Sequence, residues 1–126
     1  MDYTTLIEEL TQSYTRQIDW YSQLTILVQK ILGQITMSRG DLSGVMALFK
    51  EKQKLLDIIT QERDSTKEHI EVWQRDKDTI TTQENTAQLD NVLLETENAI
   101  KSFLASEDQL KKYLVTLTGN GNKNSP

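Results

Sequence analysis

The sequence predicts an all-α protein, an elongated antiparallel three-helix bundle with coiled-coil-like packing. Two segments near the ends of the 126-residue chain place apolar side chains at alternating steps of three and four residues, the period of a helix that packs along a narrow stripe. Two short turn-like stretches divide the chain into three parts of similar length, which favours up-down-up packing at shallow crossing angles. The first stripe comprises Tyr3, Ile7, Leu10, Tyr14, Tyr21, Leu24, Val28, Ile31 and Ile35, with Gln17 at its one polar position. The second comprises Leu89, Leu93, Thr96, Ile100, Phe103, Glu107, Leu110, Leu114 and Leu117.

The first helix is expected over residues 2–38. It begins near Asp2 or Thr4, and Gly40 follows its end, where a residue that accepts a left-handed backbone conformation closes a helix. Asp41 is placed to cap the next helix, because its carboxylate accepts a hydrogen bond from a backbone N–H that has no partner within the helix.

The second helix is expected over residues 42–78. Its first half is strongly apolar, whereas the stripe positions beyond Ile59 are often polar. Ser65 and Glu68 have the spacing of a capping box, so an interruption just before Ser65 stays open, although one continuous helix is the expectation. The β-branched and amide side chains between residues 78 and 86 disfavour helix, which predicts the second turn there.

The third helix is expected over residues 86–118, with Asn85 as its cap. The last residues, 119–126, offer no apolar side chain for packing and are predicted to form a flexible tail. Residues 1–118 then form a single helical bundle domain. The competing architecture is a long coiled-coil dimer, in which one or more segments pair with a second copy.

Composition argues against several classes of function. The net charge is −5 and Lys and Arg do not cluster, so no nucleic-acid partner is expected. The chain has no cysteine, and its only histidine, His69, has no carboxylate one helical turn away. We therefore expect no enzyme activity, no metal and no cofactor. No basic start followed by an apolar run is present, and no apolar run approaches 18 residues, so the chain is expected to be neither exported by the usual signal nor inserted in a membrane.

The segment after the first predicted helix has a distinctive order: a Gly-Asp-Leu turn, a Leu-Phe step, an acidic-lysine pair and a Leu-Leu step. Its residues are Gly40, Asp41, Leu42, Leu48, Phe49, Glu51, Lys52, Leu55, Leu56 and Ile59. This order resembles the most recognisable segment of FlgN-like flagellar export chaperones. The resemblance covers residues 1 to about 75, and the remainder of the chain matches only in pattern.

The resemblance implies a cytoplasmic bacterial chaperone of the flagellar type III secretion system. Such a chaperone binds the C-terminal helical segments of hook-filament junction proteins, which are secreted hook-associated proteins. It keeps them soluble and export-competent and delivers them to the export apparatus. The third helix would then be the part that handles the substrate.

A chaperone of this kind needs an apolar stripe that it does not fully bury itself. The candidate partner-binding residues lie on the third predicted helix and are Leu89, Leu93, Ile100, Phe103, Leu110, Tyr113, Leu114 and Leu117. The other interpretation is that this stripe only packs on the first helix. The alternative function is a structural coiled-coil adaptor or homodimerising scaffold without a chaperone role, and the sequence leaves monomer and homodimer open.

Overall fold

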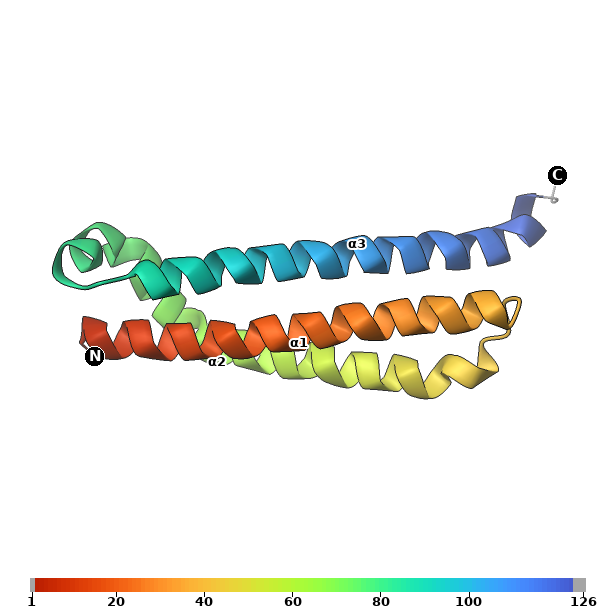
Figure 1. Ribbon diagram of the computed structural model, residues 1–126, viewed down its shortest axis with the longest axis horizontal. Helices are drawn as coiled ribbons and strands as arrows, with labels where there is room; N and C mark the ends of the chain where they lie inside the picture. Colours follow the sequence, from red (N-terminus) through yellow and green to blue (C-terminus); the bar gives the residue numbers. More distant parts are fainter. Residues whose placement is uncertain (1, 124–126) are drawn as a thin grey trace.

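The computed structural model describes residues 2–123 and confirms the all-α three-helix bundle. Helix α1 spans Tyr3–Met37, a 3₁₀ turn spans Ser43–Val45, α2 spans Met46–Gln83, and α3 spans Ala87–Lys123. The helices run up, down and up, and together they form an elongated molecule (Figure 1). The helix α2 is continuous through the region where the sequence left an interruption open.

The predicted ends of the first helix are present, whereas the predicted cap of the second is not. Asp2 precedes α1 and accepts a hydrogen bond from the Thr5 backbone N–H over 2.7 Å. Gly40 has a φ of 89°, and its N–H donates to the Ile35 carbonyl over 2.9 Å. Asp41 accepts from the Ser43 N–H over 3.0 Å within the connecting turn, but Val45 precedes α2 and makes no side-chain cap hydrogen bond. Asp41 is not the cap of α2 because the 3₁₀ turn Ser43–Val45 separates it from the helix.

The second connection is shorter than predicted. Helix α2 continues to Gln83, whereas the sequence placed the turn between residues 78 and 86. Ile80 explains the difference, because its side chain is fully buried and holds the last turn of α2 in the core. The threonines there satisfy their hydroxyls within the helix; that of Thr82 donates to the Thr79 carbonyl over 2.7 Å.

The third helix also extends beyond its predicted end. Helix α3 runs to Lys123, so residues 119–123 are helical where a flexible tail was predicted. Extending an existing helix adds one backbone hydrogen bond for each residue fixed, which opposes the cost of about 1 kcal/mol for each glycine. The remainder of the predicted tail, residues 124–126, lies outside the described part of the chain.

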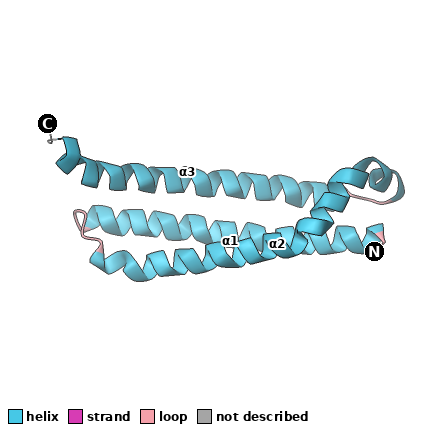
Figure 2. Ribbon diagram, turned by 180° about the vertical axis from the view of Figure 1, so that it is seen from behind, coloured by secondary structure: helices cyan, strands magenta, loops and turns pink. Residues whose placement is uncertain are grey.

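Helix α1 is the centre of the bundle, because both other helices pack against it. Within residues 2–123, no Cα atom of α2 lies within 8 Å of a Cα atom of α3. Seen from behind, α2 starts beside α1 and crosses it toward the first turns of α3 (Figure 2). The two outer helices are therefore separated most where α2 begins and α3 ends.

The core consists of two apolar clusters with a polar layer between them. One cluster lies toward the α1–α2 turn and includes Tyr21, Ile31, Ile59 and Phe103. The other lies toward the α2–α3 turn and includes Leu6, Leu10, Trp73, Ile80 and Leu89. Burial of these side chains supplies the main stabilisation of the fold.

The polar layer is held by hydrogen bonds from α1 to α2. The Ser13 hydroxyl, 1% exposed, donates to Glu62 Oε2 over 2.6 Å and accepts from the Gln17 amide over 3.3 Å. Arg16 donates to the same carboxylate oxygen over 2.8 Å. The hydrogen bond from Arg16 lowers the pKa of Glu62. Partial burial of the carboxyl group raises this pKa, and the hydrogen bond from Ser13 lowers it further. The layer therefore carries a charge that is paired and hydrogen-bonded.

Candidate functional site

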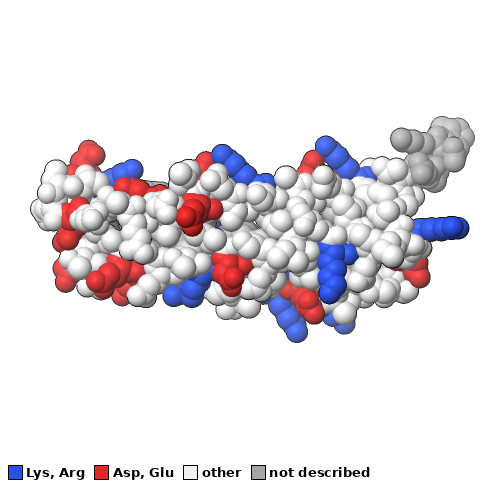
Figure 3. All heavy atoms as spheres, viewed as in Figure 1, with Lys and Arg blue, Asp and Glu red and all other residues white. Residues whose placement is uncertain are grey.

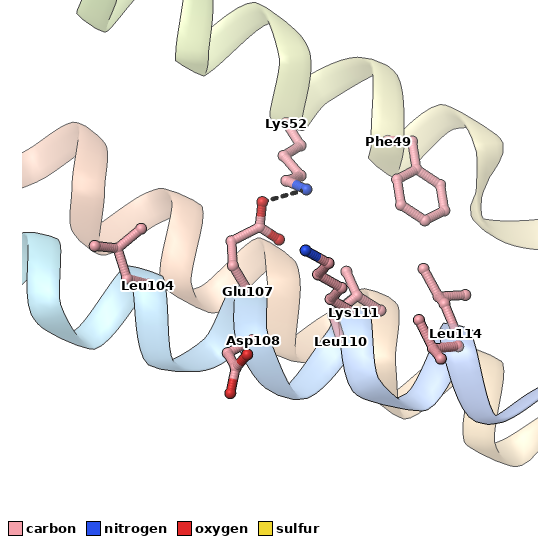
Figure 4. A pocket seen from close by; sticks show the side chains of 9 residues that line it. Phe49, Lys52, Leu104, Glu107, Asp108, Leu110, Lys111 and Leu114 are labelled. Carbon is pink, nitrogen blue, oxygen red and sulfur yellow. Dashed lines mark ion pairs between the residues drawn. The ribbon is translucent and has the colours of Figure 1, made fainter.

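A groove lies between α2 and α3, with α1 behind it. We call it the α2–α3 groove; the hollow between the two helices has a volume of about 470 Å³. Figure 4 shows the side chains that line it, with α2 on one side and α3 on the other. They are Phe49, Lys52, Leu104, Glu107, Asp108, Leu110, Lys111, Leu114 and Val115.

The wall from α2 lies beside the row that packs on α1 and shares one position with it. Val45, Ile59, Thr66, Trp73 and Ile80 form the row at steps of seven residues, except for one step of fourteen between Val45 and Ile59. Lys52 occupies the position midway in that longer step. A second set recurs at steps of three and four and lies to one side of that row. We call this set the groove face of α2; it comprises Phe49, Lys52, Leu56, Thr60, Arg63, Lys67, Ile70 and Gln74.

A second hollow lies nearer the middle of the molecule, between α1 and α2. It has a volume of about 530 Å³, and its lining residues are Tyr14 of α1 and residues of α2, among them Arg63, Asp64, Lys67 and Ile70. Burial raises the pKa of the Tyr14 phenol, so this tyrosine is neutral at physiological pH. The hollow is more polar than the first, because threonine, charged and amide side chains surround it.

One ion pair crosses the groove. Lys52 Nζ lies 2.6 Å from Glu107 Oε1, and the two side chains are 16% and 27% exposed. The same ammonium lies 6.0 Å from the centre of the Phe49 ring. Among residues 2–117, whose side chains the structure describes, this is the one ion pair or side-chain hydrogen bond between α2 and α3 (Figure 4). A single polar contact therefore joins the two walls.

The structure separates the predicted partner-binding residues into three groups. Leu89, Phe103 and Leu110 are buried, with exposures of 0%, 5% and 2%. These three pack inside the bundle, and Leu110 also contributes to the floor of the groove. They contact a partner fully only if α3 moves away from α1.

The other predicted residues are partly exposed, in different places. Leu114 lines the groove. Leu93 and Ile100 lie on the same side of α3 as Glu107, fourteen and seven residues before it. Tyr113 lies in the opposite crevice, beside Leu32 of α1. Leu117 packs under the first turn, where its Cδ2 lies 3.2 Å from the position that a Cβ of Gly40 would take.

Seven of the nine residues that line the groove were not predicted as partner-binding residues. Five of them lie on α3, among them Leu104 and Val115, which are 56% and 57% exposed. The other two, Phe49 and Lys52, form the wall from α2 and were noted in the sequence only for the family resemblance. A sequence signal for these residues exists. Each helix has a second set of positions at steps of three and four residues, next to the set that packs in the core, and this second set contains groove residues.

The titratable side chains outside the groove are dispersed. No group of three or more His, Asp or Glu side chains in the described part of the chain could hold a metal ion. His69 Nδ1 lies 3.3 Å from Glu9 Oε2 on the surface, away from the groove. Charged side chains are spread over the face seen in Figure 3, with acidic groups gathered near the N-terminal end of α1.

Comparisons with known protein families, with curated proteins and with solved structures found no match to this chain. Within the described residues, no helix has an apolar stretch of the length needed to cross a lipid bilayer.

Proposed function

We propose that this protein is an export chaperone that binds an amphipathic helical segment of a secreted protein in the α2–α3 groove. The observation that carries the proposal is that α2 and α3 both pack on α1 and do not approach each other within 8 Å between Cα atoms in the described residues. A helix laid between them would contact both walls and complete a four-helix arrangement. Apolar residues of such a ligand would cover Phe49, Leu104 and Leu114.

The exposure of the groove residues supports binding by burial of apolar surface. Leu104 and Val115 are large apolar side chains that remain more than half exposed in the isolated chain. Each apolar side chain that a ligand covers fully contributes about 1.5–3 kcal/mol relative to exposure. A ligand helix also gains protection, because its own apolar stripe is removed from water during the time before export.

The resemblance of residues 40–59 to FlgN-like chaperones supplies the class of substrate. On that basis we propose that the ligands are the C-terminal helical segments of flagellar hook-filament junction proteins, that binding takes place in the cytoplasm, and that the complex delivers its cargo to the type III export apparatus. Two residues of the resembling segment, Phe49 and Lys52, line the groove.

Substitution of Leu104 by aspartate tests the proposal. The side chain is 56% exposed, so Leu104→Asp preserves the fold while it places a charge at the groove. The matched control is Ile26→Asp, because Ile26 is 66% exposed on the side of α1 opposite to Leu24 and Val28. Circular dichroism verifies the helix content and the melting temperature of both variants.

Each variant is then titrated with a labelled C-terminal peptide of a hook-filament junction protein. We expect the wild type and Ile26→Asp to bind with equal affinity and Leu104→Asp to bind at least about tenfold more weakly, as expected for a loss of 1.5 kcal/mol or more. If Leu104→Asp captures the peptide as well as wild type does, the groove is not the binding site. If no variant binds the peptide, the proposed substrate is wrong.

The alternative function, a homodimerising scaffold, makes a different prediction. Two copies would cover their exposed apolar groove residues with each other, so the mass in solution would depend on concentration. Sedimentation of the wild type at micromolar to high micromolar concentration separates the two functions. A monomer throughout supports the chaperone, whereas a dimer that Leu104→Asp dissociates supports the scaffold.

A further inference from the structure

The groove carries a charge that differs from that of the rest of the molecule. The chain has a net charge of −5, and eight acidic residues lie on α2, yet none of them occupies the groove face of α2. That face instead contains three cations, Lys52, Arg63 and Lys67. From the opposite wall Lys111 extends into the space between the helices (Figure 4).

Most of these cations have no partner for their charge within the protein. Lys52 is paired with Glu107. No ion pair in the described part of the chain involves Arg63, Lys67 or Lys111, although the other cations of the groove region are paired. These three side chains therefore offer their full charge to a ligand in the groove.

The acidic residues near the groove do not cancel this charge. Glu107 is occupied by Lys52, and Glu97, on the same side of α3, pairs with Lys101 over 3.2 Å. Asp108 points away from α2 (Figure 4) and pairs with Lys112 over 2.9 Å. Asp64 lines the middle hollow beside Arg63 and Lys67 and is the one acidic residue there. Along the two hollows, three cations without an ion pair therefore stand against one carboxylate without an ion pair, and the charge that remains is positive.

We propose that the ligand is an amphipathic helix whose apolar stripe is flanked by Asp and Glu. This inference rests on the proposed function and names the chemistry of its ligand. Lys52 and Lys67 are fifteen positions apart, which is about 22 Å along a helix. A ligand helix of about five turns reaches Lys111 near one end and Arg63 with Lys67 near the other, so its acidic residues meet cations along the whole length.

The same charges disfavour a second copy of this chain as the occupant. In a two-fold dimer through the groove, each copy would present Arg63 and Lys67 to the equivalent cations of its partner. Like charges brought together in a partly desolvated interface are repulsive. An acidic helix would be attracted to the groove, because its carboxylates would form ion pairs with cations that have no ion pair in the free protein.

Two designed peptides of about twenty residues provide the test. Both have the same apolar stripe at steps of three and four; one has Glu and the other has Lys at the flanking positions. We expect the Glu peptide to bind the full chain about tenfold more tightly in fluorescence anisotropy at low salt, because each exposed ion pair adds a fraction of that factor. The advantage decreases as the ionic strength rises.

Charge reversal on the protein assigns the effect to the groove. The variant Arg63→Glu with Lys67→Glu is expected to lose or invert the preference for the Glu peptide. The matched control is Lys50→Glu with Lys54→Glu, which has the same spacing and charge change on the exposed side of α2 away from the groove. This control retains most of the preference, and circular dichroism verifies that both variants are folded.

The outcomes distinguish this inference from the proposed function. If both peptides bind with equal affinity, the charge assignment is overturned and capture of helices by the groove stands. The same holds if the control variant loses the preference as completely as the groove variant, since the effect then reflects net charge alone. If neither peptide binds, or if binding occurs but is unchanged in Leu104→Asp, the helix-binding groove itself is wrong.

Discussion

Replacing Glu62 with glutamine tests the polar layer, because glutamine keeps the shape of the side chain and removes its charge. The carboxylate accepts from Ser13 Oγ over 2.6 Å and from Arg16 Nη2 over 2.8 Å. A hydrogen bond to a charged group contributes about 1.5–3 kcal/mol, and a neutral one, which glutamine retains, about 1 kcal/mol. Since Arg16 is 49% exposed, its ion pair is screened and adds about 0.5 kcal/mol. We expect Glu62→Gln to lower the free energy of unfolding by about 1–2 kcal/mol at pH 7.

Urea unfolding followed by circular dichroism measures this loss. The control is Glu71→Gln on the same helix, since Glu71 is exposed and makes no ion pair or side-chain hydrogen bond in the described part of the chain. Its effect on the free energy of unfolding should stay within about 0.5 kcal/mol. Equal effects of the two substitutions would refute the assignment of a stabilising role to the Glu62 contacts.

The effect of Glu62→Gln should also depend on pH in a defined direction. The pKa of Glu62 in the folded protein lies below its ordinary value of 4.5. The carboxylate therefore stabilises the fold above that ordinary pKa, and the stabilisation decreases as the pH falls through the lower pKa of the folded state. Repeating the unfolding between pH 7 and pH 3 should show the difference from wild type decreasing. A difference that stays constant would mean that the charge is not its cause.

Three further substitutions test other parts of the fold. Ile80→Ala should lower the free energy of unfolding by about 2–4 kcal/mol, because the side chain is fully buried. The control is Thr82→Ala, since Thr82 is exposed. A loss below about 1 kcal/mol for Ile80→Ala, similar to that of the control, would favour the turn that the sequence predicted there. Gly40→Ala should cost about 1–2 kcal/mol in thermal unfolding, because the residue has a φ of 89° and the new Cβ would meet another side chain at 3.2 Å; no change would contradict this backbone conformation. Lys52→Ala and Glu107→Ala should show a coupling of about 0.5–1 kcal/mol in a double-mutant cycle, and additive effects would mean that the ion pair across the groove is absent in solution.

The fold class and the starts of the first and third helices were predictable because they depend on local patterns, whereas α2 begins at Met46 and not at the predicted residue 42. The three-four repeats predicted long helices, and Asp2 and Gly40 marked the limits of the first one correctly. The register of burial was less accurate: Leu6 and Ser13 are buried more deeply than the predicted Ile7 and Tyr14. The reason is that α1 contacts helices on two sides, so its buried arc is wider and centred differently from that of a simple two-helix seam.

The end of α2 could not be read from local propensity. The threonines around Ile80 disfavour helix in isolation, but the burial of Ile80 against residues far along the chain outweighs that preference. A sequence shows the propensity of each residue and does not show which side chain will find a tertiary partner.

The groove was harder to predict than the helices, because two of its walls come from different parts of the chain. The periodicity of α3 identifies an apolar stripe, and the sequence left open which of its residues bind a partner and which pack on the first helix. In the structure, Phe103 from this stripe is buried and Leu114 lines the groove. Which residues of α3 are buried and which line the groove depends on the distance between α2 and α3. This distance cannot be predicted from the periodicity of one helix.

Because α2 and α3 pack on α1 and hardly on each other, parts of the molecule can unfold separately. Melting of α3 leaves every backbone contact between α1 and α2 in place, and melting of α2 leaves those between α1 and α3. Apart from the Lys52–Glu107 ion pair, the outer helices are therefore coupled through α1, and each can open locally with little direct effect on the other. A ligand helix that contacts both α2 and α3 would link these two helices directly. Amide protons of α2 and α3 that exchange at different rates in the free protein would then exchange at a common rate in the complex.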